Sequence, residues 1–317
     1  MPVTQTSIYM ALPAQAIPSM SPGQTSSSAP IFAVVTPFNS GDDVDHGALR
    51  DYLLWLHSNG VTRVVVCGTT GEFPSLTLAE RRAVIETARA AFSGEVIAHA
   101  SSCSVSETRE MIAHARDFSD AVLLLPPYYF ADVTQEGVRE FFMRIAGDCP
   151  LPVYLYNFPR HTQFNIKPAL LQRLQGDLPM LRGIKDSGGK WDQAVAYKQA
   201  QPRLQVIVGS DGAALRVLKE GLDGSVTGGA SPVPQLMTLV HSRFVAGDQN
   251  GAESAQKRLD EWTIARKSAG VHEIALVKAV LSRLIFGFPA HVRTPLMSGV
   301  PKDFEPLVQL ARDAGNA

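Results

Sequence analysis

Cysteine and histidine, the residues that most often build disulfide frameworks and metal sites, are sparse and scattered in this sequence. Cys67, Cys103 and Cys149 are odd in number, widely spaced and without a CxxC pair, which predicts small, reduced core residues in a cytoplasmic protein. The histidines include no HxH or HExxH run. Because a metal enzyme needs clustered His and carboxylate ligands, the sequence predicts no metal site.

Net charge and long apolar runs are also missing. Lys and Arg number 29 against 30 Asp and Glu, a net charge of −1, so no basic surplus indicates a nucleic-acid partner. No apolar stretch approaches the length that spans a bilayer, so we expect no membrane association. With 317 residues, of which 45% are hydrophobic, the chain is long enough to form one large core.

The first thirty residues contain no charged side chain and are rich in Ser, Pro, Ala and Gln. A signal peptide needs a basic start and an unbroken apolar centre, which Pro13, Pro18 and Pro22 interrupt. A mitochondrial presequence would carry arginines, and this segment has none. We therefore predict a flexible N-terminal extension over residues 1–30.

From residue 31 the chain alternates short β-branched runs with amphipathic segments. The runs are continuously apolar, as in parallel strands that are covered on both faces. The predicted strands are 31–35, 63–67, 95–99, 121–125, 152–156, 181–185, 204–208 and 224–227. Predicted helices include one that ends at Asn59-Gly60, two that begin with capping boxes at Thr77–Glu80 and Ser104–Glu107, and 134–146, 167–175, 191–200, 212–220 and 234–246. Beyond residue 250 only helical patterns remain, over 252–268, 271–286 and 303–314.

Eight such units in residues 31–246 predict an α/β fold, a closed (β/α)8 TIM barrel, with residues 247–317 as a helical extension of the same domain. An open doubly wound sheet is the alternative, although the chain offers no second domain. In a barrel, function gathers at the carboxyl ends of the strands. The residues that follow each predicted strand are therefore the candidates for a functional site.

The sixth strand ends in Lys185, within the apolar run 181–187. Lysine has a reference pKa of roughly 10.4, and apolar surroundings can lower the pKa of a lysine by several units. The neutral amine that results can attack a ketone and form a Schiff base. The alternative, on this segment alone, is a surface lysine paired with Asp186.

The second strand ends in Gly68-Thr69-Thr70-Gly71-Glu72. Its glycines let a ligand approach the backbone, and its hydroxyls and N–H groups suit a small carboxylate. No Gly-Lys-Ser/Thr follows, so a phosphate-binding P-loop is excluded. A plain turn between strand and helix is the alternative for this segment.

Two further strands end in tyrosines, at Pro126-Pro127-Tyr128-Tyr129 and at Tyr156-Asn157-Phe158-Pro159. A phenol within reach of a Schiff-base lysine can move protons during carbinolamine formation and carbon–carbon cleavage, although tyrosines at strand ends also simply pack. The seventh strand ends at Gly209 and the eighth at Gly228-Gly229, which leaves room for a substrate above the barrel.

The order GTTGE, PPYY, YNxP and GIKDS resembles the dihydrodipicolinate synthase/N-acetylneuraminate lyase family of pyruvate-dependent class I aldolases, from residue 31 onward. The resemblance implies that Lys185 forms an imine with pyruvate or another 2-oxo acid. Thr69 and Thr70 would hold the carboxylate of this small-molecule substrate, and Tyr156 would be the general acid/base. It further implies a homotetramer of tight dimers, in which Tyr129 enters the neighbouring subunit's site and completes a hydroxyl relay. Neither a metal nor an organic cofactor is implied.

Three departures bear on the substrate. The synthases that use aspartate semialdehyde usually carry an arginine two residues after the YNxP proline, whereas here Arg160 comes one residue early and His161 takes that place. Phe130 and Asp186-Ser187 also differ from their usual residues. These motifs are closer to members that act on 2-keto-3-deoxy sugar acids, as aldolases or dehydratases, with the dihydrodipicolinate synthase reaction as the alternative.

The remaining predictions concern residues around this site. Arg160 is either a carboxylate clamp or a surface arginine, and His161 either bonds a substrate hydroxyl or is an ordinary loop histidine. Gly68, Gly209 and Val226 are further candidates for contact with the substrate. His99 lies near a strand end and could face the mouth of the barrel, but it is predicted to be a core imidazole with its hydrogen bonds satisfied. Cys67 is predicted to be a packing residue. A non-catalytic barrel that binds 2-oxo acids is the alternative function.

Overall fold

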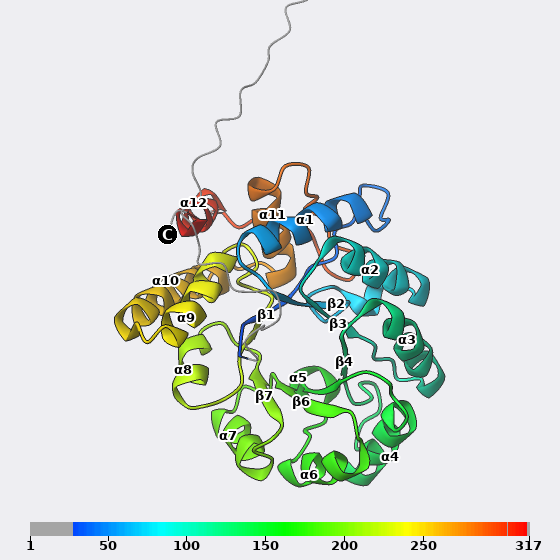
Figure 1. Ribbon diagram of the computed structural model, residues 1–317. Helices are drawn as coiled ribbons and strands as arrows, with labels where there is room; N and C mark the ends of the chain where they lie inside the picture. The colour runs from blue at the N-terminus through cyan, green and yellow to red at the C-terminus, as the bar shows by residue number, and fades with distance from the viewer. Residues whose placement is uncertain (1–27, 303, 316–317) are drawn as a thin grey trace, which may run out of the picture.

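The computed structural model describes residues 28–302 and 304–315, in which eight parallel strands form one barrel (Figure 1). Strands pair in the order β7-β6-β5-β4-β3-β2-β1-β8, and a parallel bridge between Val208 and Ser225 joins the two ends. The strands are β1 Ile31–Ala33, β2 Arg63–Val66, β3 Glu95–His99, β4 Ala121–Leu124, β5 Val153–Asn157, β6 Leu181–Asp186, β7 Gln205–Val208 and β8 Val226–Thr227. The predicted (β/α)8 barrel is confirmed, and the alternative of an open sheet is wrong.

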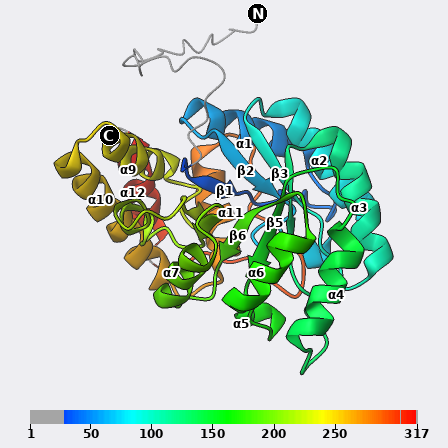
Figure 2. The same ribbon diagram turned by 60° about the horizontal axis from the view of Figure 1, so that its bottom comes forward.

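Helices follow the strands and form the outer layer of the barrel (Figure 2). They are α1 His46–Ser58, α2 Leu78–Ala91, α3 Val105–Phe118, α4 Gln135–Ala146, α6 Pro168–Asp177, α7 Trp191–Ala200, α8 Ala214–Lys219 and α9 Pro234–Val245, followed by α10 Gln249–Lys267, α11 Glu273–Leu284 and α12 Phe304–Gly315. Two single-turn elements at strand ends escaped prediction, the 3-10 helix η1 Phe73–Ser75 and α5 Pro159–Thr162. Within residues 28–302 and 304–315, each helix is too short or too polar to cross a membrane.

The two predicted capping boxes differ in outcome. At α2, the Thr77 hydroxyl accepts a hydrogen bond from the Glu80 N–H at 3.2 Å and the Glu80 carboxylate accepts one from the Thr77 N–H at 2.8 Å. At α3, Ser104 caps the N–H of Glu107, but the Glu107 carboxylate accepts its hydrogen bond from the Ser102 hydroxyl at 2.6 Å. The second box is therefore half formed, because a nearer hydroxyl competes for the carboxylate.

The barrel axis is filled by side chains from every strand, as the alternation of a β-strand requires. A small void on the axis is lined by Ile31, Val65, Ile97, Leu123, Tyr154, Lys185, Ile207 and Val226. Lys185 is the one charged member of this ring. Its aliphatic stem therefore lies among hydrocarbon, while its amine lies toward the carboxyl ends of the strands.

The amino ends of the strands are sealed by polar side chains that pair with one another. The Arg63 guanidinium donates to the Glu95 carboxylate at 2.5 Å, and the Tyr154 hydroxyl donates to the Gln205 side-chain oxygen at 2.8 Å. These pairs lie at the end of the barrel opposite to the one where functional residues gather in such folds.

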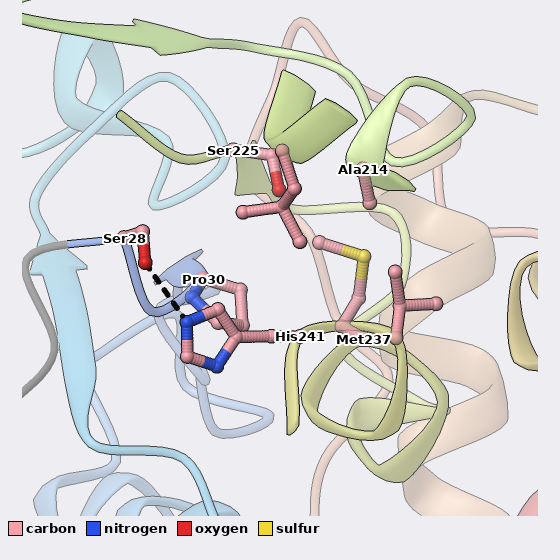
Figure 3. A pocket seen from close by; sticks show the side chains of 8 residues that line it. Ser28, Pro30, Ala214, Ser225, Met237 and His241 are labelled. Atoms are coloured by element: carbon pink, nitrogen blue, oxygen red, sulfur yellow. Dashed lines mark hydrogen bonds between the residues drawn. The ribbon is translucent and has the colours of Figure 1, made fainter. Parts of the chain in front are cut away.

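The segments that flank the barrel pack against it. Helix α10 packs along α9, and α12 contacts α9, α10 and α11. The predicted N-terminal extension lies outside the described residues except for 28–30. There Ala29 and Pro30 are buried, and the Ser28 hydroxyl lies 3.1 Å from Nε2 of His241 beside α9 (Figure 3). The described chain is thus already packed against the barrel at residue 28.

Candidate active site

Lys185 lies on β6 directly opposite Tyr156 of β5, its partner in the strand register. The lysine is 6% exposed, and its Nζ lies 4.0 Å from the centroid of the Tyr156 ring. Within residues 28–302 and 304–315, no carboxylate lies within ion-pair distance of this amine. Asp186 faces away from it and accepts a hydrogen bond from the Asn157 amide at 2.8 Å. A surface lysine paired with Asp186 is therefore not what the fold forms.

The tyrosine begins a stack of rings that leads to the rim of the barrel. The ring of Phe158 stacks on Tyr156 with centroids 5.4 Å apart, and His161 meets Phe158 edge-on at 4.2 Å. Arg160 and His161 are both exposed on α5. Partial burial lowers the pKa of His161, and the neighbouring Arg160 and His272 lower it further. The Phe158 ring thus separates His161 from Tyr156, and Arg160 precedes His161 on α5 at the rim.

The Gly68–Glu72 loop reaches across to the end of β8. A Cβ built on Gly228 would overlap the Thr70 hydroxyl and lie 2.8 Å from its Cγ2, so the Thr70 side chain rests on the bare backbone of Gly228. The backbone of the loop is held by the Thr36 hydroxyl, which donates to the Gly71 carbonyl at 2.8 Å. Thr70 is therefore fixed at the carboxyl end of the barrel, where Lys185 also lies.

A buried ion pair supports this loop from behind. Glu72 has left-handed backbone torsions, and its carboxylate accepts a hydrogen bond from Nζ of Lys278 at 2.5 Å and one from the N–H of Arg293 at 3.0 Å. Burial lowers the pKa of Lys278 to about 8, while the Glu72 carboxylate acts in the opposite direction. The Lys278 amine also lies over the Phe38 ring, 4.1 Å from its centroid. Helix α11 and the chain after it are thereby joined to the threonine loop.

The ends of β7 and β8 are held by a second buried ion pair. Asp211, which follows β7, accepts a hydrogen bond from the Arg266 guanidinium at 2.9 Å, and Arg266 also pairs with Glu273. A Cβ on Gly209 would overlap the Ser187 hydroxyl, so the ends of β6 and β7 are in close contact at this predicted substrate-binding glycine. Helix α10 therefore fixes this side of the rim.

The remaining predicted site residues differ in their placement. Tyr129 is 84% exposed and Phe130 59% exposed, on the loop after β4. Val226 belongs to the ring of side chains around the axial void, below the rim. Gly68 begins the threonine loop, where an added Cβ would meet only the Val65 side chain, at 3.4 Å. Within the described part of the chain, no group of three His, Cys, Asp or Glu residues could hold a metal ion.

Two features escaped sequence reasoning. The Glu72–Lys278 pair joins residues 206 positions apart, and an acidic residue after the Thr pair was its only local signal. His99 was predicted to be a satisfied core imidazole, and it is fully buried, yet neither ring nitrogen makes a well-aligned hydrogen bond with a described residue, and the Cys67 backbone supplies at most one poorly aligned hydrogen bond. That prediction is therefore right about burial and only partly right about the hydrogen bonds. Its position two residues after Ile97 was the available signal that it faces the barrel interior.

Comparison with known proteins identifies the family. The profile of the dihydrodipicolinate synthetase family matches residues 26–311. The chain belongs to this family. A 4-hydroxy-tetrahydrodipicolinate synthase from Hyphomonas neptunium is 35% identical over 234 residues, which are 72% of this chain and 78% of that protein. The predicted resemblance is thereby confirmed.

Solved structures agree with the family assignment. KD(P)GA from T. tenax is 28% identical, with a TM-score of 0.78 over 91% of this chain and 99% of that one. The sialic acid aldolase of Ruminococcus gnavus, 22% identical, shares the fold with a TM-score of 0.85 over 92% of this chain and 99% of that one. Members of the dihydrodipicolinate synthetase family are lyases of the class I aldolase type that bind small molecules, and this chain is an enzyme of that kind. The alternative of a non-catalytic barrel is therefore wrong.

Proposed function

We propose that the enzyme joins Lys185 to a 2-oxo acid as an imine and acts on 2-keto-3-deoxy sugar acids, as an aldolase or a dehydratase. The observation that carries this proposal is the Lys185 amine, buried in the barrel, 4.0 Å from the Tyr156 ring and without a described carboxylate partner. A lysine amine in such a position can attack the ketone of a 2-oxo acid and form an imine.

The proposed steps use the residues around this amine. Nζ of Lys185 attacks C2 of the 2-oxo acid, and the C2 oxygen leaves as water with the phenolic proton of Tyr156, which leaves a protonated imine and a phenolate. In cleavage, the phenolate takes the proton of the C4 hydroxyl as the C3–C4 bond breaks and its electrons pass to the imine. In dehydration, C3 loses a proton to the phenolate, and the C4 hydroxyl takes that proton and leaves as water. Thr69 and Thr70 hold the carboxylate, and Gly68, Gly209 and Val226 shape the space around it.

Residues at the rim of the barrel would select the substrate in this proposal. Arg160 and His161 are exposed above the Tyr156–Phe158 stack, in a position to contact the far end of a substrate. Arg160 would pair with a distal carboxylate, and His161 would bond a hydroxyl. The motif departures at Phe130 and Asp186 favour sugar acids over aspartate semialdehyde, and the likeness to KD(P)GA from T. tenax supports this choice.

A second candidate is the 4-hydroxy-tetrahydrodipicolinate synthase reaction, condensation of pyruvate with aspartate semialdehyde. The curated relatives at 33% to 35% identity that carry this name favour it. A panel that compares 2-keto-3-deoxy sugar acids with pyruvate plus aspartate semialdehyde decides between the two. A higher kcat/KM for the semialdehyde reaction would reject our preferred substrate class.

The imine itself is tested by trapping. Treatment with pyruvate and borohydride should add one covalent pyruvate-derived group, mapped by peptide mass to Lys185 and absent from Lys185→Met. Lys278 is an internal control, because it is also buried but paired with Glu72, and its peptide should remain unmodified. An unlabelled protein, or a label on another lysine, rejects the proposal.

We further propose a homotetramer of tight dimers in the cytoplasm. The exposed pair Tyr129 and Phe130 supports the first part, because a second copy that covered this loop would bury two large aromatic side chains and bring Tyr129 to its partner's site. The second part is supported by Cys67, Cys103 and Cys149, which are all free thiols, as a reducing compartment would keep them.

A further inference from the structure

His99 occupies the interior of the barrel beside the proposed catalytic pair. It is the last residue of β3, and Ile97, two residues before it on the same face, lines the axial void. The His99 ring lies against Phe73 with centroids 4.4 Å apart and meets the Tyr156 ring edge-on at 6.4 Å. Since Tyr156 carries the Lys185 amine over its ring, the imidazole, the phenol and the amine form one layer of the barrel.

The position of this imidazole is fixed from behind. The buried Arg81 guanidinium, from α2, donates to the His99 carbonyl at 2.7 Å and to the Ser101 carbonyl at 3.0 Å. These bonds hold the backbone at the end of β3. The Phe73 side chain covers the His99 imidazole, and the centroid of the Phe73 ring lies 5.5 Å from the guanidinium carbon of Arg81. The imidazole is therefore presented to the layer of Tyr156 in a constrained orientation.

The ring nitrogens are incompletely paired in this layer. Neither Nδ1 nor Nε2, both buried, makes a well-aligned hydrogen bond with a described residue, and the Cys67 backbone supplies at most one poorly aligned hydrogen bond. Burial lowers the pKa of His99 well below 6.5, the positive charges of Arg81 and Lys185 lower it further, and the backbone hydrogen bond with Cys67 has the opposite effect. The ring is thus neutral and leaves at least one nitrogen for a ligand.

Packing does not account for a histidine here. A buried polar atom without a well-aligned partner destabilises a fold, whereas a phenyl ring or a leucine would fill similar space without that penalty. The imidazole can complete its hydrogen bonds only when a polar ligand enters the layer. A 2-oxo acid joined to Lys185 would be held in this layer by its covalent bond to Nζ.

We propose that His99 is a substrate-recognition residue whose imidazole forms a hydrogen bond with a chain hydroxyl of the 2-oxo acid attached to Lys185. The inference rests on the proposed imine function and deepens it. The substrate carboxylate is assigned to Thr69 and Thr70, and the C2 oxygen is lost as water on imine formation. The oxygens that remain include hydroxyls beyond C3, which 2-keto-3-deoxy sugar acids have and pyruvate lacks.

The test separates recognition of the hydroxylated chain from imine formation. His99→Phe should still trap pyruvate on Lys185 with borohydride at the parent's level. Its kcat/KM for the best 2-keto-3-deoxy sugar acid of the panel should fall by about 10²-fold, as when one positioned hydrogen-bond donor is lost from an active site. Its Tm should rise by roughly 2 to 4 °C, because a buried unpaired group is removed. His99→Gln, which keeps a donor and an acceptor, should recover part of the activity.

A matched control comes from α10. The Thr263 hydroxyl is also buried without a hydrogen-bond partner among the described residues. Thr263 is not one of the proposed site residues. Thr263→Val should raise Tm in the same way and leave kcat/KM unchanged. The control thus shows the effect of removing an unpaired polar atom alone.

Three results would overturn the inference. His99→Phe with kcat/KM within twofold of the parent would show that the imidazole is not used. A loss of trapping that parallels the loss of turnover would place His99 in imine formation instead. A lower Tm in His99→Phe and in the smaller His99→Leu would show a structural role. Absence of trapping in the parent enzyme is a different failure, that of the proposed function itself.

Discussion

Nζ of Lys278 lies 2.5 Å from a carboxylate oxygen of Glu72, and both side chains are within 1% of complete burial. The pair connects α11 to the loop that carries Thr69 and Thr70 although the two residues are 206 positions apart. Since Glu72 is the last residue of that loop, the C-terminal helices support the candidate site as well as the barrel wall.

Removing one member of this pair should destabilise the protein more than removing both. Lys278→Met leaves the Glu72 carboxylate buried without its cation, which costs about 3 to 5 kcal/mol, while the double variant Glu72→Gln/Lys278→Met leaves no unpaired charge. Urea denaturation of the parent, both single variants and the double variant measures the difference. A double variant as unstable as the sum of the singles would contradict the pairing.

Tyr156→Phe should reduce kcat by roughly 10²- to 10⁴-fold with little change in Tm, because it removes the proposed general acid/base but keeps the ring that stacks on Phe158. Steady-state kinetics on the preferred substrate, together with a thermal melt, make the measurement. Full turnover in this variant would reject the role of Tyr156 in proton transfer.

Gly228→Ala should raise KM for the 2-oxo acid by about 10-fold or more, because the new methyl group overlaps the Thr70 side chain and displaces it. The control is Gly176→Ala on α6, where an added Cβ meets nothing within 4 Å, and this change should be neutral or slightly stabilising. If Gly228→Ala keeps the parent KM, Thr70 does not contribute to substrate binding.

His99 should make the protein less stable in acid. Burial holds its folded-state pKa well below 6.5, so the unfolded chain takes up a proton first as the pH falls below about 6.5. Stability should then decrease by up to about 1.4 kcal/mol for each further pH unit until the folded-state pKa is reached. His99→Phe should lose this pH-dependent contribution below about pH 6.5, whereas identical slopes in the two proteins would show that His99 does not titrate on unfolding.

The exposed aromatic loop predicts the assembly. If Tyr129 and Phe130 lie in a subunit interface, Phe130→Glu should shift the protein to smaller species by light scattering, and kcat should fall with it. Leu54→Glu, at an exposed apolar residue of α1, is the comparison and should leave the proposed Tyr129 interface intact. A monomeric parent enzyme would contradict the tetramer.

Most of the fold could be predicted because apolar runs and helix caps are local signals. Each predicted strand and helix is present, and Lys185 and Tyr156 lie on adjacent strands because consecutive β/α units are neighbours in a barrel. The short elements η1 and α5 were missed, since single turns at strand ends have no periodicity. The Ser104 capping box was half wrong because Ser102 competes for Glu107.

By itself, the sequence determined the barrel, its order of strands and the strand ends at which chemistry is expected. Hydrophobic periodicity and caps act over a few residues, so they can be seen in one dimension. Only the tertiary structure decided that Lys185 has no carboxylate partner among the described residues, that Lys278 pairs with Glu72, and that the His99 nitrogens are incompletely paired. These properties depend on which side chains from distant segments meet in a low-dielectric interior, and no local pattern records such meetings.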